Sequence, residues 1–572
     1  MSDNTPPQTE QAERTNRTGS AIPRRGALGL IGAAGLGAAF SGAASASGST
    51  SGGPETGNQP WYKWDADVDA CDNGLYDLNS LEVDHTYTGA REPDVIVWQD
   101  DDGTYHADGT DDYVASGDDY LGIIQAAVDS LTEDRTTKER VLVTADGTVE
   151  ATDELEQVVL PSYTVVDVPA TIHVEDEGQS LVIPFRGLAE EEIEIPRLNV
   201  TGNPRFGLVL QNCDNVRLGH INVQFENLDV LDPYQDHPNF DPDNDDFPPS
   251  HEPDRPRDEQ LADPVHVGEI NEGIRVSGRS REGDATDILL ESAYIENANH
   301  HAVEFYDIDR VQIGRVLGNE MQGCGLILNG ITDATVDSVI GRNPSSSTAY
   351  ATFRCANDCE NATIGNVLSR DAPRGIHITS GSDDITVGNV NIIGARNNAG
   401  IAIDGVENIT IGGGLIKNTD GEGVRAWGNT VTITNLRVVD ERDEDERNQT
   451  HGIEFTGSNG RIVNNDVRDG GTVADLHIDV DDETVVRGNI GGGLAAGTTT
   501  LESDAEPAAR VEGVSDDWAG SLSARTHLQD EPPGQYALDH RFEWTGEEWD
   551  LVFEWEADPG SNLELEYVVD RL

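Results

Sequence analysis

The chain has 572 residues, with 107 Asp and Glu against 37 Lys and Arg, and a formal net charge of −70. This acidic excess excludes nucleic acid as an expected partner, because proteins that bind phosphate backbones rely on Lys and Arg. Apolar residues still make up 36% of the chain. The composition therefore indicates a folded protein adapted to concentrated salt, where the charge maintains solubility.

Residues 1–46 are expected to be a targeting segment rather than part of the fold. Arg24 and Arg25 precede an apolar run rich in Gly and Ala, and small residues at 44–46 offer a cleavage site. The pattern resembles a twin-arginine signal, which implies export of a folded protein to the cell surface or the extracellular medium. No later run approaches the ~20 apolar residues of a membrane span.

An acidic linker and N-terminal arm are expected over 47–115, followed by one amphipathic helix from Tyr120 to Leu131. Leu121, Ile124 and Val128 recur at helical spacing, and the acidic pair before Tyr120 can cap the first turn. A helix placed over the open end of a stack of strands protects the edge strand. We therefore expect this helix to act as an N-terminal cap.

The stretch from about Gly273 to Gly493 repeats itself in short β-branched runs broken by Gly, Asn and Asp. The first apolar residues of successive units lie 25, 25, 25, 23 and 29 residues apart: Leu326, Ala351, Ile376, Ile401, Val424 and Ile453. A second phrase recurs at 361–367, 384–390 and 408–412. A period of this length without intervening helices predicts a parallel β-helix, with Asn366 and Asn389 at a turn where their amides stack between rungs.

The β-helix is expected over 116–497, interrupted by an acidic, Pro-rich insertion at 232–265. A loop of this length either lies over a groove or lacks fixed structure. Strict alternation at 549–555 and 563–569 predicts a small antiparallel β module over 498–572. The fold class is therefore all-β.

The stretch from Gly117 to Val128 resembles the opening of pectate-lyase-like and polygalacturonase-like β-helices, in which a helix of similar sequence caps the first rung. The resemblance covers about residues 116–495. It implies a right-handed parallel β-helix of the pectin lyase-like superfamily and an activity on polysaccharides.

Five cysteines at irregular spacing do not make a disulfide framework. Cys355 and Cys359 either bridge a turn or are small buried residues. Both alternatives remain open from the sequence.

Alternation along each strand assigns inward and outward side chains, so outward residues of different units align in columns. We expect Arg354 in one column with Asn329 and Asp404. The aligned stripe supplies expected catalytic residues (Glu304, Arg354, His377, Asp404 and, from a turn, Asp420) and expected substrate-binding residues (Tyr306, Asn329, Arg425, Trp427 and Glu454). Aromatic rings can stack on sugars, and Arg can bind uronate carboxylates.

Two chemistries fit the stripe. Glycoside hydrolysis needs two carboxyl groups about 5–9.5 Å apart, and residues 418–420 match the Asn-Thr-Asp motif of polygalacturonases. One unit later, however, Thr450-His451-Gly452 stands where those hydrolases have Asp-Asp. A lyase instead needs a base, which the resemblance implies is Arg or Lys, and a cation that neutralises the uronate carboxylate, either Arg or Ca²⁺. The arginines available are Arg354, Arg370, Arg374 and Arg425, and the possible Ca²⁺ ligands are Asp371, Asp404 and Glu304.

The first hypothesis is a secreted, salt-adapted enzyme that cleaves a polysaccharide by lyase or hydrolase chemistry. The alternative is a non-catalytic surface or adhesive β-helix that binds glycans or envelope partners. No cofactor is certain, with Ca²⁺ the candidate. We expect a monomer or a small homo-oligomer.

Overall fold

The computed structural model describes residues 92–110, 112–152, 154–175, 181–226, 256–262, 271–278, 285–342, 350–396, 398–480, 484–491 and the strands that follow them. The expected signal segment, most of the arm and most of the 232–265 insertion lie outside the described residues. Neither helix in the described part of the chain has the length and hydropathy that a membrane span requires.

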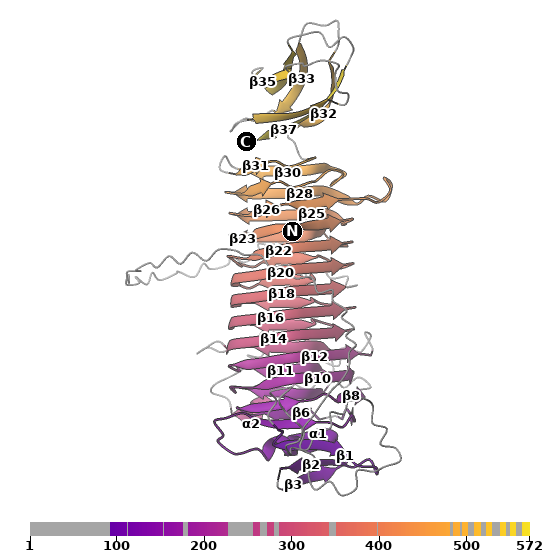
Figure 1. The fold of residues 1–572 in the computed structure, drawn as a ribbon, viewed down its shortest axis with the longest axis vertical. Coiled ribbons are helices and arrows are strands. Elements are labelled where there is room, and N and C mark those ends of the chain that lie inside the picture. The colour runs from indigo at the N-terminus through magenta and orange to yellow at the C-terminus, as the bar shows by residue number, and fades with distance from the viewer. Residues whose placement is uncertain are drawn as a thin grey trace, which may run out of the picture. The chain divides into compact units, whose positions relative to one another are not determined.

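The described chain is a parallel β-helix, as the repeat predicts (Figure 1). One side of the coil is a 12-stranded sheet in which every neighbouring pair is parallel. Its strands are β6 (Glu156–Leu160), β9 (Val182–Leu188), β11 (Phe206–Gln211), β13 (Glu272–Ser277), β15 (Val303–Tyr306), β17 (Leu326–Asn329), β19 (Phe353–Ala356), β21 (Ile376–Thr379), β23 (Asn398–Glu407), β25 (Gly421–Asn429), β28 (Gln449–Ser458) and β30 (Ala474–Val480).

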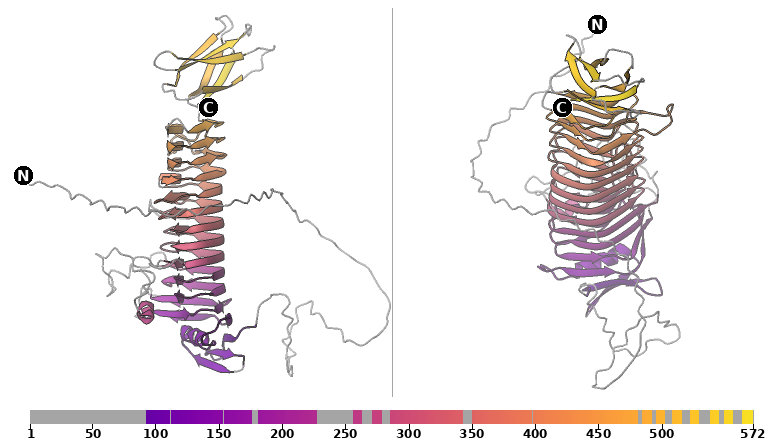
Figure 2. Two further views of the ribbon diagram at one scale, coloured as in Figure 1. Left: turned by 90° about the vertical axis from the view of Figure 1, so that its left-hand side faces the viewer. Right: turned by 45° about the horizontal axis from the view of Figure 1, so that its top comes forward.

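The remaining sides of the coil are formed by a second, 19-stranded sheet, whose longer strands bend around the core (Figure 2). Beyond the first rungs each strand of the 12-stranded sheet is followed by one or two strands of this second sheet. Sixteen of its strands are β4 (Glu139–Val143), β5 (Gly147–Glu150), β7 (Thr164–Asp167), β8 (Thr171–Glu175), β10 (Glu194–Gly202), β12 (Val216–Phe225), β14 (Ala285–Glu296), β16 (Ile308–Asn319), β18 (Thr332–Arg342), β20 (Glu360–Arg370), β22 (Thr386–Ile393), β24 (Thr410–Lys417), β26 (Thr432–Thr434), β27 (Leu436–Val439), β29 (Arg461–Val463) and β31 (Val485–Arg487), and the other three precede α1.

The first rungs are closed by α1 (Tyr120–Asp129) and by three strands, β1 (Val95–Gln99), β2 (Tyr105–Gly109) and β3 (Tyr113–Gly117). The side chain of Asp119 accepts from Gly122 N at 3.0 Å and caps α1. Gln125 on α1 accepts from Val159 N at 2.6 Å and donates to Val159 O at 3.3 Å. The predicted capping helix thus satisfies backbone groups of β6, the edge strand of the 12-stranded sheet.

The core is a set of stacked inward columns. In the 12-stranded sheet one column contains Phe305, Leu328, Ile378 and Phe455, each with no exposed surface. A single rung cannot bury these side chains, so stacking supplies the stabilisation. Cys355 is part of the same column, and it and Cys359 are buried free thiols rather than a bridge.

The predicted stacking of Asn side chains is present at a bend within the long strands. Asn389 donates to Asn366 Oδ1 at 3.4 Å, and Asn366 donates to Asp337 O at 3.2 Å. The residue before Asn389 is glycine for a steric reason. A Cβ at Gly388 would lie 2.7 Å from the carbonyl oxygen of Gly365.

The predicted spacing is wrong at one rung. Leu326 pairs with Phe353, and Phe353 pairs with Ile376, so the intervals are 27 and 23 residues rather than 25 each. A turn outside the ladder absorbs the two extra residues, which a uniform period could not reveal. Arg354 therefore pairs with Ile327 and His377 and lies one column away from Asn329 and Asp404.

The predicted C-terminal antiparallel strands are confirmed. They form two three-stranded sheets, in the orders β32–β37–β34 and β33–β36–β35. The strands are β32 (Ala495–Leu501), β33 (Ala508–Ser515), β34 (Leu522–Leu528), β35 (Leu538–Trp544), β36 (Trp549–Trp555) and β37 (Leu563–Arg571).

Candidate functional site

The outer face of the 12-stranded sheet gathers the polar residues that the sequence places in a stripe. Register defines a first column, which contains Arg275, Glu304, Ile327, Arg354, His377, Ala402, Arg425, Glu454 and His477, and a second column, which contains Ser277, Tyr306, Asn329, Ala356, Thr379, Asp404, Trp427 and Thr456. All the predicted stripe residues except Asp420, which lies in the turn before β25, therefore lie on this face.

His377 and Asp404 form the centre of the site. His377 Nε2 lies 3.0 Å from Asp404 Oδ2. Arg425 donates from Nη2 to both oxygens of Asp404, at 2.9 and 3.1 Å, and its Nη1 bonds Asn398. The strands β21, β23 and β25 supply these side chains from neighbouring rungs, which is why residues 48 positions apart in sequence can meet.

Electrostatics keep Asp404 ionised and His377 neutral. Burial raises the pKa of Asp404, but the hydrogen bonds from His377 and Arg425 outweigh it and hold the pKa below its usual range. Burial lowers the pKa of His377, and Arg374 and Arg354 act in the same direction against Asp404. Because an ionised carboxylate only accepts, neutral His377 donates from Nε2 and carries its lone pair on Nδ1.

Two further arginines surround this pair, and we call Arg354, Arg374 and Arg425 the arginine cluster. Arg374 is 6% exposed, and burial lowers its pKa, with Asp404 opposing and Arg425 and Arg354 reinforcing the shift. Arg354 precedes His377 in the first column. Its Nε is buried and has no hydrogen-bond partner among the described residues. A buried guanidinium nitrogen that donates to nothing is costly, and an anionic ligand beside it would remove that cost.

A second polar group lies toward β13 and β15. Arg275 Nη1 is 3.4 Å from Glu304 Oε2 and 3.8 Å from Glu272 Oε2. Asn329 donates to Glu304 Oε1 at 2.8 Å. Glu304 and Asn329 are 3% and 5% exposed, so these outward residues are covered rather than solvated. Glu304 is thus engaged with a cation and an amide.

His300, His301 and Tyr350 form a cluster beside this second group, in which His300 Nδ1 lies 3.6 Å from Glu272 Oε2. The two imidazole rings have centroids 3.7 Å apart, and His300 Nε2 lies 3.1 Å from the hydroxyl of Tyr350. His301 is buried and accepts from Cys324 N at 2.8 Å through Nδ1. Burial holds the pKa of His301 well below its ordinary value, reinforced by His300, Arg354 and Arg275.

The aromatic residues of the stripe differ in exposure. Trp427 is 62% exposed and pairs in register with Asp404, while Tyr306 on β15 is partly buried. Trp427 offers a flat apolar ring beside the ionised centre. Such a ring is suited to stacking on the face of a sugar.

Asp420 lies in the turn before β25 and is engaged away from the centre. Arg442 Nη1 donates to its Oδ1 at 2.6 Å, and Asn448 donates to the same oxygen at 3.4 Å. The proposed Ca²⁺ ligands are likewise paired separately: Asp371 lies 3.5 Å from Arg396, Asp404 bonds Arg425, and Glu304 bonds Asn329.

Several residues of this face lie in a third column that the predicted stripe did not include. The positions three residues before the first column hold Glu272, His301, Cys324, Arg374, Glu422 and His451, with Ala at the other three. Extending the strand alignment three residues upstream would have shown a charged column here. Tyr350 lies outside the repeating strand positions, so the same alignment would not have identified it.

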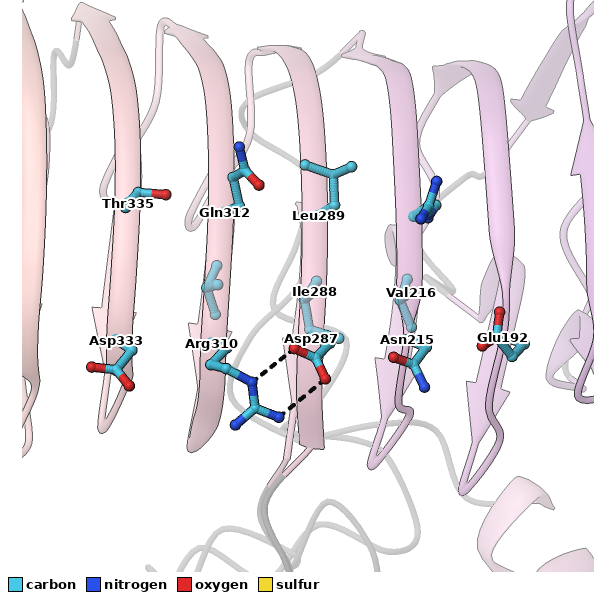
Figure 3. A pocket seen from close by; sticks show the side chains of 12 residues that line it. Glu192, Asn215, Val216, Asp287, Ile288, Leu289, Arg310, Gln312, Asp333 and Thr335 are labelled. Atoms are coloured by element: carbon cyan, nitrogen blue, oxygen red, sulfur yellow. Dashed lines mark hydrogen bonds and ion pairs between the residues drawn. The ribbon is translucent and has the colours of Figure 1, made fainter. Parts of the chain in front are cut away.

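A different hollow, of about 420 Å³, lies on the long strands of the opposite sheet (Figure 3). Asp287, Arg310 and Asp333 line it in left-handed turn conformations at one corner of successive rungs. Arg310 donates to Asp287 from Nε at 2.8 Å and from Nη2 at 3.0 Å. Arg310, which lines the hollow together with Arg217, is therefore already paired with a protein carboxylate.

No protein-family model and no curated protein matches the chain. Among solved structures it is similar to the A-module of mannuronan C-5 epimerase from Azotobacter vinelandii, with 12% identity over 65% of this chain and 94% of that chain and a TM-score of 0.43. The tailspike protein of Pseudomonas phage LKA1 matches with 10% identity over 74% of this chain and 67% of that chain, TM-score 0.34. A tailspike mutant of E. coli bacteriophage HK620 in complex with a hexasaccharide matches with 8% identity over 81% and 92%, TM-score 0.35.

Proposed function

We propose that the protein is a secreted, salt-adapted β-helix that binds a uronate-containing polysaccharide along its 12-stranded sheet and cleaves it by β-elimination. The observation that carries the proposal is Arg354. Its Nε is buried and has no hydrogen-bond partner in the described part of the chain, although the chain holds 107 acidic residues against 37 basic ones. A planar guanidinium held without a protein carboxylate is suited to a carboxylate supplied by a ligand.

The extent of the polar face fits a chain of sugars rather than a single small molecule. Polar residues run from Arg275 on β13 to Glu454 on β28, which are eight strands of the sheet. At about 4.8 Å per rung the face spans about 34 Å. Tyr306 on β15 and Trp427 on β25 supply rings for stacking, Asn329 on β17 supplies a polar contact between them, and Glu454 lies one strand beyond Trp427.

The chemistry follows from the protonation states at the centre. Neutral His377, oriented by Asp404, removes the proton on the carbon next to the uronate carboxylate through Nδ1. The electron pair left on that carbon forms a double bond to the neighbouring carbon, and the glycosidic oxygen leaves from there and takes up a proton from water. Arg354, Arg374 and Arg425 neutralise the carboxylate while negative charge builds up on it.

Hydrolysis is supported less well by the same residues. It requires one protonated carboxylic acid beside one carboxylate. Asp404 is held ionised by His377 and Arg425, and Asp420 is bound to Arg442. The alternative of a non-catalytic glycan-binding protein uses the same aromatic and arginine surface without the proton transfer at His377.

The export signal and the salt adaptation belong to the proposal and are supported by composition alone. Arg24, Arg25 and the apolar run after them support export. The net charge of −70 would repel an acidic polysaccharide in dilute buffer, whereas in about 1 M salt that repulsion is screened within roughly 3 Å. Concentrated salt therefore favours contact between the arginine cluster and a uronate.

The test incubates the purified protein in concentrated salt with a panel of acidic and neutral polysaccharides. Unsaturated uronate ends, which absorb ultraviolet light, are expected from the wild type and not from His377→Gln. His220→Gln is the matched control, because His220 lies on β12 of the other sheet and bonds Ser292 at 2.7 Å. New reducing ends without unsaturation would indicate hydrolysis, and binding without cleavage would indicate the non-catalytic alternative.

A further inference from the structure

Two glutamates and a histidine meet at the end of the 12-stranded sheet beyond the arginine cluster. Glu422 on β25 pairs in register with His451 on β28, and Glu454 lies three residues further along β28. One donor atom from each of the three lies within 4.8 Å of the other two. Adjacent rungs of the ladder therefore bring two carboxylates and an imidazole to one point.

These groups are poorly satisfied by the protein. Glu422 Oε2 and His451 Nδ1 are buried and have no hydrogen-bond partner among the described residues. The other oxygen of Glu422 has a single long contact in that part of the chain, 3.5 Å from Thr450 Oγ1. Arg425, the register partner of Glu454, bonds Asp404 and Asn398 instead. Buried carboxylate and imidazole atoms left in this way are costly unless a cation lies between them.

We propose that Glu422, His451 and Glu454 bind a divalent transition-metal ion of the Zn²⁺ class. An imidazole nitrogen with two carboxylates is a donor set for zinc and related ions, whereas Ca²⁺ takes only oxygen ligands. Zinc bonds of about 2.0–2.1 Å place tetrahedral donors about 3.3 Å apart. Donors within 4.8 Å of one another reach that spacing by small side-chain rotations.

The site has room for a fourth donor. His477 follows Glu454 in the first column, and its ring centroid lies 5.4 Å from that of His451. It can add a second imidazole, or a water molecule can complete the coordination. The proposal depends on these side chains alone and is independent of any activity on glycans.

The experiment uses the full chain after chelator treatment and dialysis, at fixed salt concentration. Titration calorimetry with Zn²⁺, with metal analysis after gel filtration, is expected to show one tight site in the wild type. His451→Gln and the double variant Glu422→Gln, Glu454→Gln should each weaken binding at least tenfold, since each removes one or more ligands. Glu407→Gln is the matched control, because Glu407 bonds Asn429 at 3.3 Å on a neighbouring exposed segment.

A second readout keeps the test valid if a variant folds poorly. Co²⁺ bound to the wild type should give visible absorption bands of a nitrogen-ligated ion, and the bands should change in His451→Gln. Zn²⁺ should raise the thermal midpoint of the wild type and leave that of the double variant unchanged. Absence of a stoichiometric Zn²⁺ site, equal binding by wild type and variants, or binding of Ca²⁺ in preference to Zn²⁺ would each overturn the proposal.

Discussion

His301 makes part of the site sensitive to acid, and the effect can be calculated. Its side chain is 3% exposed and accepts a hydrogen bond from Cys324 N through Nδ1. Burial and the neighbouring cationic groups hold its pKa well below the ordinary value, so the folded rung keeps His301 neutral. The opened chain takes up a proton near pH 6.5. The contribution of neutral His301 to the stability of the rung is therefore fully present above that pH and is lost as the pH falls toward the lowered pKa.

The expected loss follows from proton linkage. If only the opened state binds the proton, lowering the pH from 6.5 to 5.0 costs about 1.6 kcal/mol at this one residue. His301→Asn retains an acceptor oxygen near the position of Nδ1 and does not titrate. Between pH 6.5 and pH 5.0 the free energy of local opening of β15 and β17 should fall in both proteins. The fall should be about 1.6 kcal/mol smaller in the variant than in the wild type.

Hydrogen exchange of the amides in β15 and β17, measured for both proteins at pH 6.5 and 5.0 and at one salt concentration, gives these local free energies. The intrinsic exchange rates of these amides and the many titrating carboxylates are the same in both proteins. The difference between their pH dependences therefore reports the titration of His301 alone. Equal pH dependence in the two proteins would refute the reasoning. It would mean that His301 protonates as readily in the folded rung as in the opened one.

Three further predictions concern the proposed reaction. Asp404→Asn should lower kcat by about 10²–10⁴-fold. It should also move the acidic limb of the kcat/KM profile to lower pH, because Asp404 raises the pKa of His377 against the effect of burial. An unchanged kcat together with an unchanged pH profile would exclude this pair from the mechanism. Trp427→Ala should weaken glycan binding by about 1–2 kcal/mol in calorimetry, whereas Tyr113→Ala, equally exposed but on β3, should leave it unchanged. Stopped-flow measurements should show that an acidic oligosaccharide associates faster as the salt concentration rises, because salt screens its repulsion by the net charge of −70. A steep fall of the association rate constant with salt would instead indicate a strong positive field at the site.

The fold could be predicted from the sequence because the same steric and burial constraints recur at equivalent positions of each rung. Inward positions such as Ile378 and Ile403 must be apolar, and the Gly before Asn389 must lack a Cβ. These constraints recur at each rung and make the period visible. The helix that caps the first rung was equally readable, because its apolar face and Asp119 cap are local features.

The site was harder to predict, since its geometry depends on the turns between strands. Two extra residues ahead of Phe353 moved Arg354 by one column, and nothing in the strand pattern records the length of a turn. Tyr350 covers the histidine pair from outside the repeat. Burial was also not predictable: alternation indicated that Glu304 faces outward, but only the structure shows that it is covered.

Recognition of a carboxylate by the arginine cluster is the central claim, and one calorimetric comparison tests it most directly. The wild type is titrated with an oligouronate and with the same oligosaccharide after reduction of its carboxyl groups to alcohols. A hydrogen bond to a charged group contributes about 1.5–3 kcal/mol, so the acidic form should bind about 10- to 100-fold more tightly. Arg354→Gln should remove most of that preference. Equal affinity of the wild type for the two forms would contradict the account.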